Sequence, residues 1–272
     1  MRKQSCSFGR GLAWLIVCAS SLLIQPSISL ASERVSNQHQ GVPAYFYPHI
    51  GNPSNAWERM CSTMNTQQGP STAVMNPSSG PGTAKNADYV NAIQSCHSHG
   101  QQVIGYVHTS YGQRSLVTVE GEVSEYYQWY QVDGIFVDEM SNDSSTVAYY
   151  HALYQFIHAQ GGSQATLVVG NPGAAASSDW QLTQQAADEL LIFEGSAKTY
   201  ISWSPPSWVA TYAAGTFWNV VYHASTLASL QTICRHAQTV NAGFMYVTYG
   251  TLPNPYGFLP KASYWKRELA AC

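Results

Sequence analysis

Short apolar runs alternate with segments of helical periodicity along most of this chain. Runs of roughly four to eight residues rich in Val, Ile, Tyr and Phe are typical of buried strands. The first is 42–48 (VPAYFYP), and it is followed by 55–64, where apolar residues recur at helical spacing. Near the middle a long helix is expected over 145–160, because capping residues precede it and the pair Gly161-Gly162 ends it.

Eight such strand–helix pairs follow one another from residue 42 to the C-terminus. The predicted strands are 42–48, 71–77, 102–109, 132–138, 165–170, 189–194, 217–223 and 243–249, and the predicted helices are 55–64, 87–99, 121–130, 145–160, 179–187, 206–214, 227–242 and 263–271. Repeated alternation of this kind predicts an α/β protein with a parallel sheet covered by helices, and eight pairs in this length predict a single (β/α)8 TIM barrel. A doubly wound open sheet is the alternative, although no Gly-x-Gly-x-x-Gly follows the first strand. Because no linker divides the chain, 42–272 is expected to be one domain.

The first 31 residues have the features of an export signal. Three basic residues precede the apolar segment 12–24, and Ser29-Leu30-Ala31 resembles a cleavage site. The apolar segment is short for a membrane span. We therefore expect cleavage near Ala31 and a secreted protein, extracellular or periplasmic, without stable membrane association; an uncleaved anchor is the alternative. Residues 32–41 are polar and are expected to be a flexible entry to the barrel domain.

Composition narrows the classes of partner. Only 10% of residues are charged, against about a quarter in an average protein. Of 12 basic and 15 acidic residues the leader removes three basic ones, which leaves nine against 15 and a formal charge of −6. Without a basic patch, nucleic acid is not an expected partner. The 18 Tyr and 8 Trp suit stacking on sugar rings, although core packing explains aromatic residues equally well.

Four cysteines remain after the leader is removed, an even number that predicts disulfides in an exported chain. Three pairings are possible. Proximity in sequence favours Cys61 with Cys96 and Cys234 with Cys272. There is no C-x-x-C motif and no histidine cluster at metal-ligand spacing, so neither a metal site nor a cofactor is predicted.

The predicted strand ends carry hydrogen-bonding side chains. In (β/α)8 barrels the functional groups lie at the C-terminal ends of the strands, and a sugar site needs such groups there. The predicted substrate-binding residues are Tyr47, His49, Asn76, His108, Tyr111, Asn171, Tyr222, His223 and Tyr249. Three of these are histidines, which leaves a metal-dependent hydrolase as a minor alternative.

Only three carboxylates fall at predicted strand exits, namely Asp138, Glu139 and Glu194. Burying charge at the end of an apolar run is costly unless the site is functional. Two carboxylates facing each other across a barrel mouth are the minimum apparatus of glycoside hydrolysis. Ser-His-Asp hydrolysis is not expected because there is no Gly-x-Ser-x-Gly elbow.

The surroundings of these carboxylates suggest their roles. Glu194 follows an apolar run and precedes a glycine, a setting that would raise its pKa as an acid/base requires. Asp138 is followed by polar residues, which suits a nucleophile that stays ionised. Because adjacent strand residues point to opposite faces, Glu139 either joins the chemistry or points aside and orients its neighbours.

Five motifs in order resemble the spherulin-4 (spherulation-specific) family. They are VPAYFYP at 42–48, NPSSGPG at 76–82, GYVHTSYG at 105–112, DGIFVDEM at 133–140 and FEG at 193–195. Members related to glycoside hydrolase family 135 are (β/α)8 barrels that cleave α-1,4-linked galactosamine or N-acetylgalactosamine polymers such as fungal galactosaminogalactan, and the more distant family 114 has similar activity. The resemblance implies that Asp138, Glu139 and Glu194 are catalytic and that Asp138 carries a glycosyl-enzyme in a retaining mechanism.

These observations predict a secreted, monomeric, endo-acting glycoside hydrolase for an α-1,4-linked galactosamine- or N-acetylgalactosamine-containing polysaccharide, for example of a biofilm matrix. The acidic mature chain would favour a partly deacetylated, cationic polymer. A non-catalytic polysaccharide-binding or cell-surface protein on the same barrel is the alternative. The separation of Asp138 and Glu194 tests the enzyme hypothesis, since about 5 Å suits retention and about 6.5–9.5 Å suits inversion.

Overall fold

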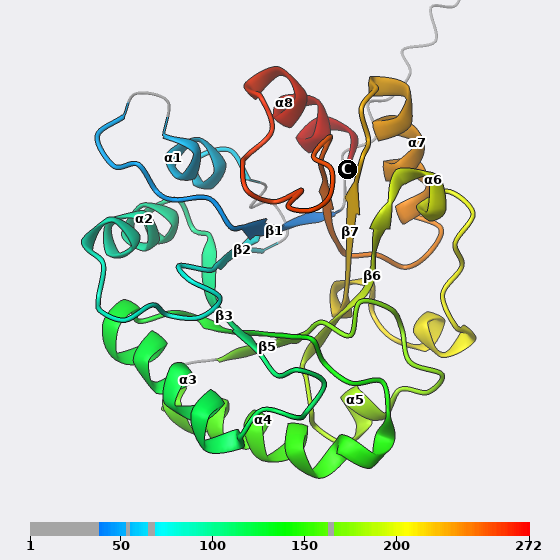
Figure 1. The fold of residues 1–272 in the computed structure, drawn as a ribbon. Coiled ribbons are helices and arrows are strands. Elements are labelled where there is room, and N and C mark those ends of the chain that lie inside the picture. The colour runs from blue at the N-terminus through cyan, green and yellow to red at the C-terminus, as the bar shows by residue number, and fades with distance from the viewer. Residues whose placement is uncertain (1–37, 53–54, 65–68, 163–165) are drawn as a thin grey trace, which may run out of the picture. The chain divides into compact units, whose positions relative to one another are not determined.

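Eight parallel strands close into a barrel in the order β1 to β8, with the helices outside (Figure 1). The computed structural model describes residues 38–52, 55–64, 69–162 and 166–272. The predicted TIM barrel is confirmed. The expected leader and most of the polar segment that follows it lie outside the described residues. Within those ranges, none of the helices combines the length and apolarity needed to cross a bilayer.

The elements follow the predicted order. The strands are β1 (His39–Ala44), β2 (Thr72–Met75), β3 (Gln102–His108), β4 (Gly134–Asp138), β5 (Leu167–Gly170), β6 (Glu189–Ser196), β7 (Phe217–Tyr222) and β8 (Phe244–Val247). The helices are α1 (Ala56–Cys61), α2 (Ala87–Ser98), α3 (Leu116–Tyr130), α4 (Val147–Gly161), α5 (Trp180–Thr183), α6 (Ala197–Tyr200), α7 (Leu227–Ala237) and α8 (Ala262–Ala271), with 3-10 turns η1 (Ser144–Thr146), η2 (Ser207–Thr211) and η3 (Ala214–Thr216).

The largest departure from the predicted helices lies after β6. The helix expected over 206–214 is absent, and the chain forms the short α6 followed by the 3-10 turns η2 and η3. Pro206 is the N-cap residue of η2, a position where the missing backbone N–H of proline is tolerated. Conversely, α3 begins at Leu116, five residues before the expected start, with Ser115 at its N-cap position.

Aromatic rings fill the part of the barrel near the starts of β7 and β8. The indole of Trp218 on β7 stacks on Phe244 of β8 with ring centroids 4.8 Å apart, and it also contacts Phe136 of β4. Gly41 on β1 faces the same indole, and a Cβ atom there would overlap the ring. A glycine in this strand therefore makes room for the largest side chain of the barrel core.

Two aspartates fasten neighbouring strands at the end where the strands begin. Asp133, just before β4, accepts a hydrogen bond from the backbone of Val103 on β3 at 2.7 Å and contacts His97 of α2 at 2.8 Å. Asp188, just before β6, accepts one from the backbone of Val168 on β5 at 2.8 Å. These acids therefore belong to the rim opposite the predicted site.

Both predicted disulfides are confirmed. Cys61 at the end of α1 joins Cys96 of α2, and Cys234 of α7 joins Cys272 after α8. Closing loops of 35 and 38 residues stabilises the fold by about 3–4 kcal/mol each on the chain-entropy model.

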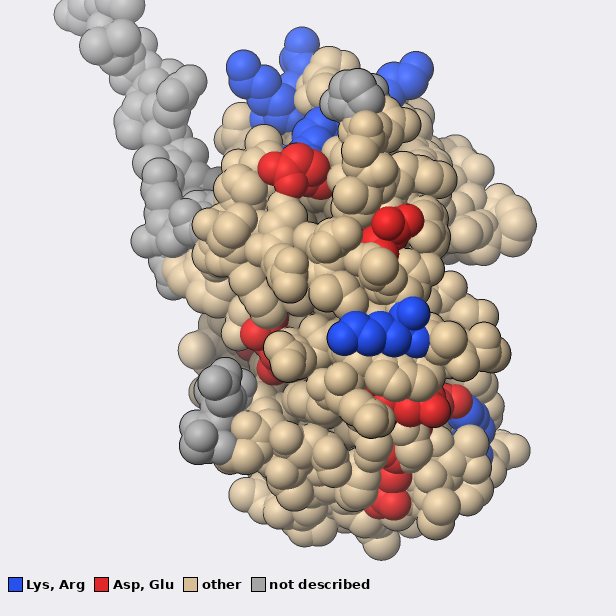
Figure 2. Space-filling model, turned by 90° about the vertical axis from the view of Figure 1, so that its left-hand side faces the viewer, with Lys and Arg blue, Asp and Glu red and all other residues tan. Residues whose placement is uncertain are grey.

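Charged side chains are scattered over the face shown in Figure 2, where most of the surface carries neutral residues. Lys and Arg gather at its upper end, the end at which α7 and α8 lie in Figure 1. The exposed basic residues of these two helices and of the residue before α8 are Arg235, Lys261, Lys266 and Arg267.

Candidate active site

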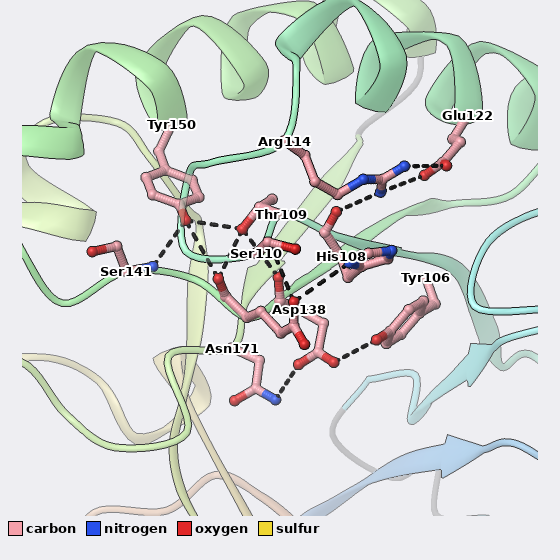
Figure 3. Close-up of polar contacts among 11 residues, drawn as sticks. Tyr106, His108, Thr109, Ser110, Arg114, Glu122, Asp138, Ser141, Tyr150 and Asn171 are labelled. Carbon is pink, nitrogen blue, oxygen red and sulfur yellow. Dashed lines mark hydrogen bonds and ion pairs between the residues drawn. The ribbon is translucent and has the colours of Figure 1, made fainter.

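Asp138 is the last residue of β4, and its side chain lies at the barrel mouth (Figure 3). It is level with His108, the last residue of β3. Its Oδ2 accepts a hydrogen bond from the Tyr106 hydroxyl at 2.6 Å, and its Oδ1 accepts one from Asn171 Nδ2 at 2.7 Å. The pKa of Asp138 is raised above its ordinary value, chiefly by burial and also by the charge of Glu139, although hydrogen bonds from Tyr106, the Glu139 backbone and Asn171 oppose the rise.

Glu194 reaches the interior only because β6 contains a bulge. Leu191 pairs with Trp218 and Glu194 pairs with Val220, so three residues of β6 span two residues of β7. Strand side chains alternate between faces, and the extra residue reverses the alternation beyond it. Glu189 near the strand start bonds the Trp218 indole, and Glu194, an odd number of residues later, also points inward.

Glu194 is held by two donors at the mouth. Its Oε2 accepts a hydrogen bond from Asn171 Nδ2 at 3.0 Å, and its Oε1 accepts one from the Tyr256 hydroxyl at 2.9 Å. Burial raises the pKa of Glu194, the two donors lower it, and the charge of Asp138 raises it. The acid therefore has one donor fewer than Asp138, whose carboxylate also bonds the backbone of Glu139.

One side-chain nitrogen bridges the two carboxylates. Asn171 follows β5, and its Nδ2 contacts both Asp138 and Glu194. The two oxygens lie 2.7 and 3.0 Å from this nitrogen, so they are no more than about 5.7 Å apart. The two carboxylates thus face each other across the end of β5.

Glu139 turns away from this pair. Its backbone is left-handed, with φ 51°, and its carbonyl accepts hydrogen bonds from Tyr111 N and Thr109 Oγ1, each at 2.8 Å. Its Oε2 lies 3.1 Å from Ser110 N and 3.4 Å from His108 Nδ1, and the side chain is 41% exposed. The three predicted carboxylates therefore form a half-buried pair bridged by Asn171 and one outlying group beside β3.

Four of the eight described non-glycine residues with left-handed backbone follow strand ends at the mouth. Ser110, Tyr111, Glu139 and His223 come after β3, β4 and β7 and have φ between 48° and 60°. This conformation is costly for residues other than glycine, and such strain clusters at functional sites. The left-handed residues therefore identify the C-terminal ends of β3, β4 and β7 as candidate functional positions.

Some predicted sugar-binding residues lie beside the carboxylates, and others support loops. His108 contacts Glu139 at 3.4 Å, and Tyr111 is 59% exposed on the loop after β3. Tyr222 ends β7, where its charge influences Tyr256, and the backbone of His223 donates to Gly250 O at 2.8 Å.

The remaining predicted residues lie farther along the rim. Tyr47 is exposed, its hydroxyl donates to Asp88 at 2.7 Å, and its ring packs on His49. The Asn76 Oδ1 accepts a hydrogen bond from Gly80 N within its own loop. The Tyr249 hydroxyl accepts one from the backbone of Lys261, so it supports the loop between β8 and α8.

Three tyrosines that the sequence pattern did not single out complete the site. Tyr45 packs on the rings of Tyr106 and Tyr256, at centroid distances of 5.5 and 5.9 Å. Burial is the largest cause that raises the pKa of Tyr45, and the charge of Asp138 is the second largest. Tyr106 is two residues before His108, so strand alternation places it on the same face and could have identified it. Tyr256 lies in a loop, where no periodicity applies.

Among the residues that the structure describes, no three His, Cys, Asp or Glu side chains are grouped as metal ligands. The strand-exit histidines lie apart in their contacts: His49 packs on Tyr47, His108 contacts Glu139, and the His223 backbone bonds Gly250.

Comparison with known proteins gives a consistent result. The sequence model of the spherulation-specific family 4 matches residues 41–272. Spherulin-4 of Physarum polycephalum is 27% identical over 246 residues, which cover 87% of this chain and 70% of that protein.

Two solved structures show the same fold. Sph3 of Aspergillus clavatus, in complex with GalNAc, superposes with a TM-score of 0.68 at 24% identity and covers 86% of this chain and 98% of its own. A chitinase of Chromobacterium violaceum superposes with a TM-score of 0.53 at 13% identity and covers 85% of this chain and 98% of its own.

Proposed function

This chain belongs to the spherulation-specific family 4, and from that premise we propose that it is a secreted endo-acting glycoside hydrolase. The proposed substrate is an α-1,4-linked polysaccharide that contains galactosamine or N-acetylgalactosamine. The observation that carries the proposal is the half-buried pair of Asp138 and Glu194, joined through Asn171 at the barrel mouth.

The spacing of the pair supports a retaining mechanism. Retaining glycosidases place their carboxyl groups about 5–5.5 Å apart, and inverting ones leave about 6.5–9.5 Å for a water molecule. The shared Asn171 nitrogen holds one oxygen of each carboxylate within about 5.7 Å of the other. This closeness supports the shorter spacing, at which one carboxylate attacks the sugar directly.

The donors around each acid support the division of roles. Burial raises the pKa of both acids, and they differ in the number of donors that oppose this rise. Asp138 accepts three hydrogen bonds, which favour its ionised form, and it is proposed to be the nucleophile. Glu194 accepts only two, so it is proposed to be the acid/base.

The proposed reaction has two steps. Asp138 attacks the anomeric carbon while Glu194 gives its proton to the departing glycosidic oxygen, which leaves a glycosyl ester on Asp138. Glu194, now ionised, then takes a proton from water. The resulting hydroxide attacks the same carbon, breaks the ester and restores both carboxyl groups, so the configuration at that carbon is retained.

The outlying residues suit recognition of the polymer. Glu139 and His108 contact each other beside the pair, and neither is bonded to the Asn171 amide. We propose that they bind the substrate and do not take part in breaking the bond. An amino-sugar substrate is supported by family membership and by the GalNAc bound to the structurally similar Sph3. Export is supported by the two disulfides.

The test incubates purified protein with galactosaminogalactan and measures new reducing ends. We expect release by the native protein and a loss of about 1000-fold or more in Asp138→Asn and Glu194→Gln, because each removes a group needed for bond cleavage. Glu125→Gln, on the outer helix α3, is the matched control and should retain activity. The first product should carry the α configuration by NMR.

Equal release by all variants would reject these roles. Binding of the polymer without cleavage by the native protein would instead support a non-catalytic polysaccharide-binding protein on the same barrel.

A further inference from the structure

We propose that Asn171 is a positioning residue. Its amide nitrogen donates hydrogen bonds to Asp138 and Glu194 and so holds the two carboxylates at one fixed separation. This inference rests on the proposed function of the pair. It gives Asn171 a role different from the sugar contact that its place at a strand end predicts.

The side chain of Asn171 has no N–H left for a sugar hydroxyl, and its oxygen already accepts one hydrogen bond from the protein. An amide nitrogen has two hydrogens, and those of Asn171 are directed at Asp138 and Glu194. Its Oδ1 accepts a hydrogen bond from Gly173 N at 2.8 Å, which determines which way round the amide lies. The residue is only 6% exposed, so a substrate could reach it only by displacing these partners.

The backbone around Asn171 is fastened to both neighbouring strand ends. Its N–H donates to Val137 O at 2.8 Å, and its carbonyl accepts from Met140 N at 2.9 Å, which ties it to both sides of Asp138. The Glu194 N–H donates to Gly173 O at 3.3 Å. Gly173 has φ 71°, a left-handed conformation that glycine adopts without cost. The segment 171–173 therefore fixes one carboxylate relative to the other across β5.

The shared amide also links the ionisation of the two acids. Its hydrogen bonds lower the pKa of both Asp138 and Glu194. The other titratable groups that face the pair come from β1, β3, β4, β7 and the loop after β8, and they are Tyr45, Tyr106, His108, Glu139, Tyr222 and Tyr256. Among the described residues that face it, Asn171 alone bonds both carboxylates, so its loss should change both pKa values together.

The kinetic test compares native protein with Asn171→Ala and Asn171→Ser on galactosaminogalactan. We expect kcat to fall about 100-fold, the usual cost of misplacing a catalytic group by about 1 Å. KM should stay within about twofold, because no substrate contact is removed. Both limbs of the pH profile of kcat/KM should move to higher pH.

The matched control is Asn142→Ala. Asn142 is exposed on the loop after β4 and bonds Ala174 O rather than either carboxylate, so this variant should behave as the native protein. Asn171→Ser fills more of the space than Ala and serves if Asn171→Ala does not fold. A rise in KM with unchanged kcat and unmoved limbs would overturn the inference in favour of a sugar contact.

A second readout does not depend on activity. Carboxyl titration by ¹³C NMR without substrate should show both apparent pKa values of the pair raised in Asn171→Ala and in Asn171→Ser. Unchanged titration would overturn the inference even in an active enzyme. A native protein that cleaves no polymer, yet shows these shifts, would reject the proposed function and leave the positioning role of Asn171 supported.

Discussion

Tyr256 and Glu194 are 62 residues apart in the chain, yet the Tyr256 hydroxyl donates a 2.9 Å hydrogen bond to Glu194 Oε1. Tyr256 lies in the loop between β8 and α8, and Glu194 lies on β6. The loop that closes the barrel therefore supplies a donor to the acid proposed for leaving-group protonation. Tyr106 has the equivalent relation to Asp138, at 2.6 Å.

Tyr256→Phe should move only one limb of the pH profile. In the native protein the hydrogen bond from Tyr256 lowers the pKa of Glu194, so removing the hydroxyl raises that pKa. Because Glu194 must be protonated in the first step, the alkaline limb of kcat/KM should move to higher pH. Tyr106→Phe is the matched variant. It removes a hydrogen bond that lowers the pKa of Asp138, which must be ionised, so the acidic limb should move to higher pH. Movement of the opposite limb in either variant would exchange the two proposed roles.

Glu139→Gln should affect substrate binding more than bond cleavage. Its carboxylate lies beside His108 and Ser110, outside the pair bridged by Asn171. Loss of one charged hydrogen bond to substrate corresponds to about a tenfold rise in KM, with kcat changed little. Steady-state kinetics on galactosaminogalactan measures this. A fall in kcat of about 1000-fold would place Glu139 in the chemical steps.

Gly41→Ala should destabilise the barrel. A methyl group at this position overlaps the Trp218 indole, and overpacking of a core costs about 1–3 kcal/mol. Urea unfolding measures the free energy. The control is Gly121→Ala in α3, where no atom lies within 4 Å of the new Cβ. That change should raise stability by about 0.5–1 kcal/mol, because alanine favours a helix interior. Equal effects at both sites would show that the indole can shift.

Asp133→Asn should alter the pH dependence of stability. The hydrogen bond from His97 to Asp133 is the main cause that raises the pKa of His97 above its ordinary value of 6.5. A histidine whose pKa is raised by folding contributes stability that is fully present below the unfolded pKa and is lost as pH rises through the folded pKa. The free energy of unfolding of the native protein should therefore exceed that of the variant most at about pH 5.5. The difference should shrink towards about pH 8. Urea unfolding across this range measures it, and a constant difference would contradict the ion pair.

Local periodicity made much of the fold predictable. Alternating apolar runs and helical segments identify eight strand–helix pairs, and the structure has these strands in the same order. The position of Asp138 at a strand exit follows from the same pattern, because Ile135, Phe136 and Val137 end directly in it. The disulfide pairing followed from proximity along the chain, since α1 and α2, like α7 and α8, are consecutive helices.

The details of the site depend on contacts between segments that no local pattern records. Strand alternation alone would put Glu189 and Glu194 on opposite faces, and only the bulge at Ile192 brings both inward. The donor from Tyr256 comes from a loop whose path is set by the packing of α8. Asn171 is an ordinary strand-end residue in sequence, and its bridging role exists only because β4 and β6 flank β5 in the closed barrel.

The sequence by itself determined the barrel and two carboxylates at strand exits, because side-chain periodicity and strand length are local properties of the chain. The tertiary structure alone decided that Asp138 and Glu194 share one amide nitrogen, at 2.7 and 3.0 Å. Distances across a barrel depend on the register and closure of its strands, which arise from contacts between residues far apart in sequence.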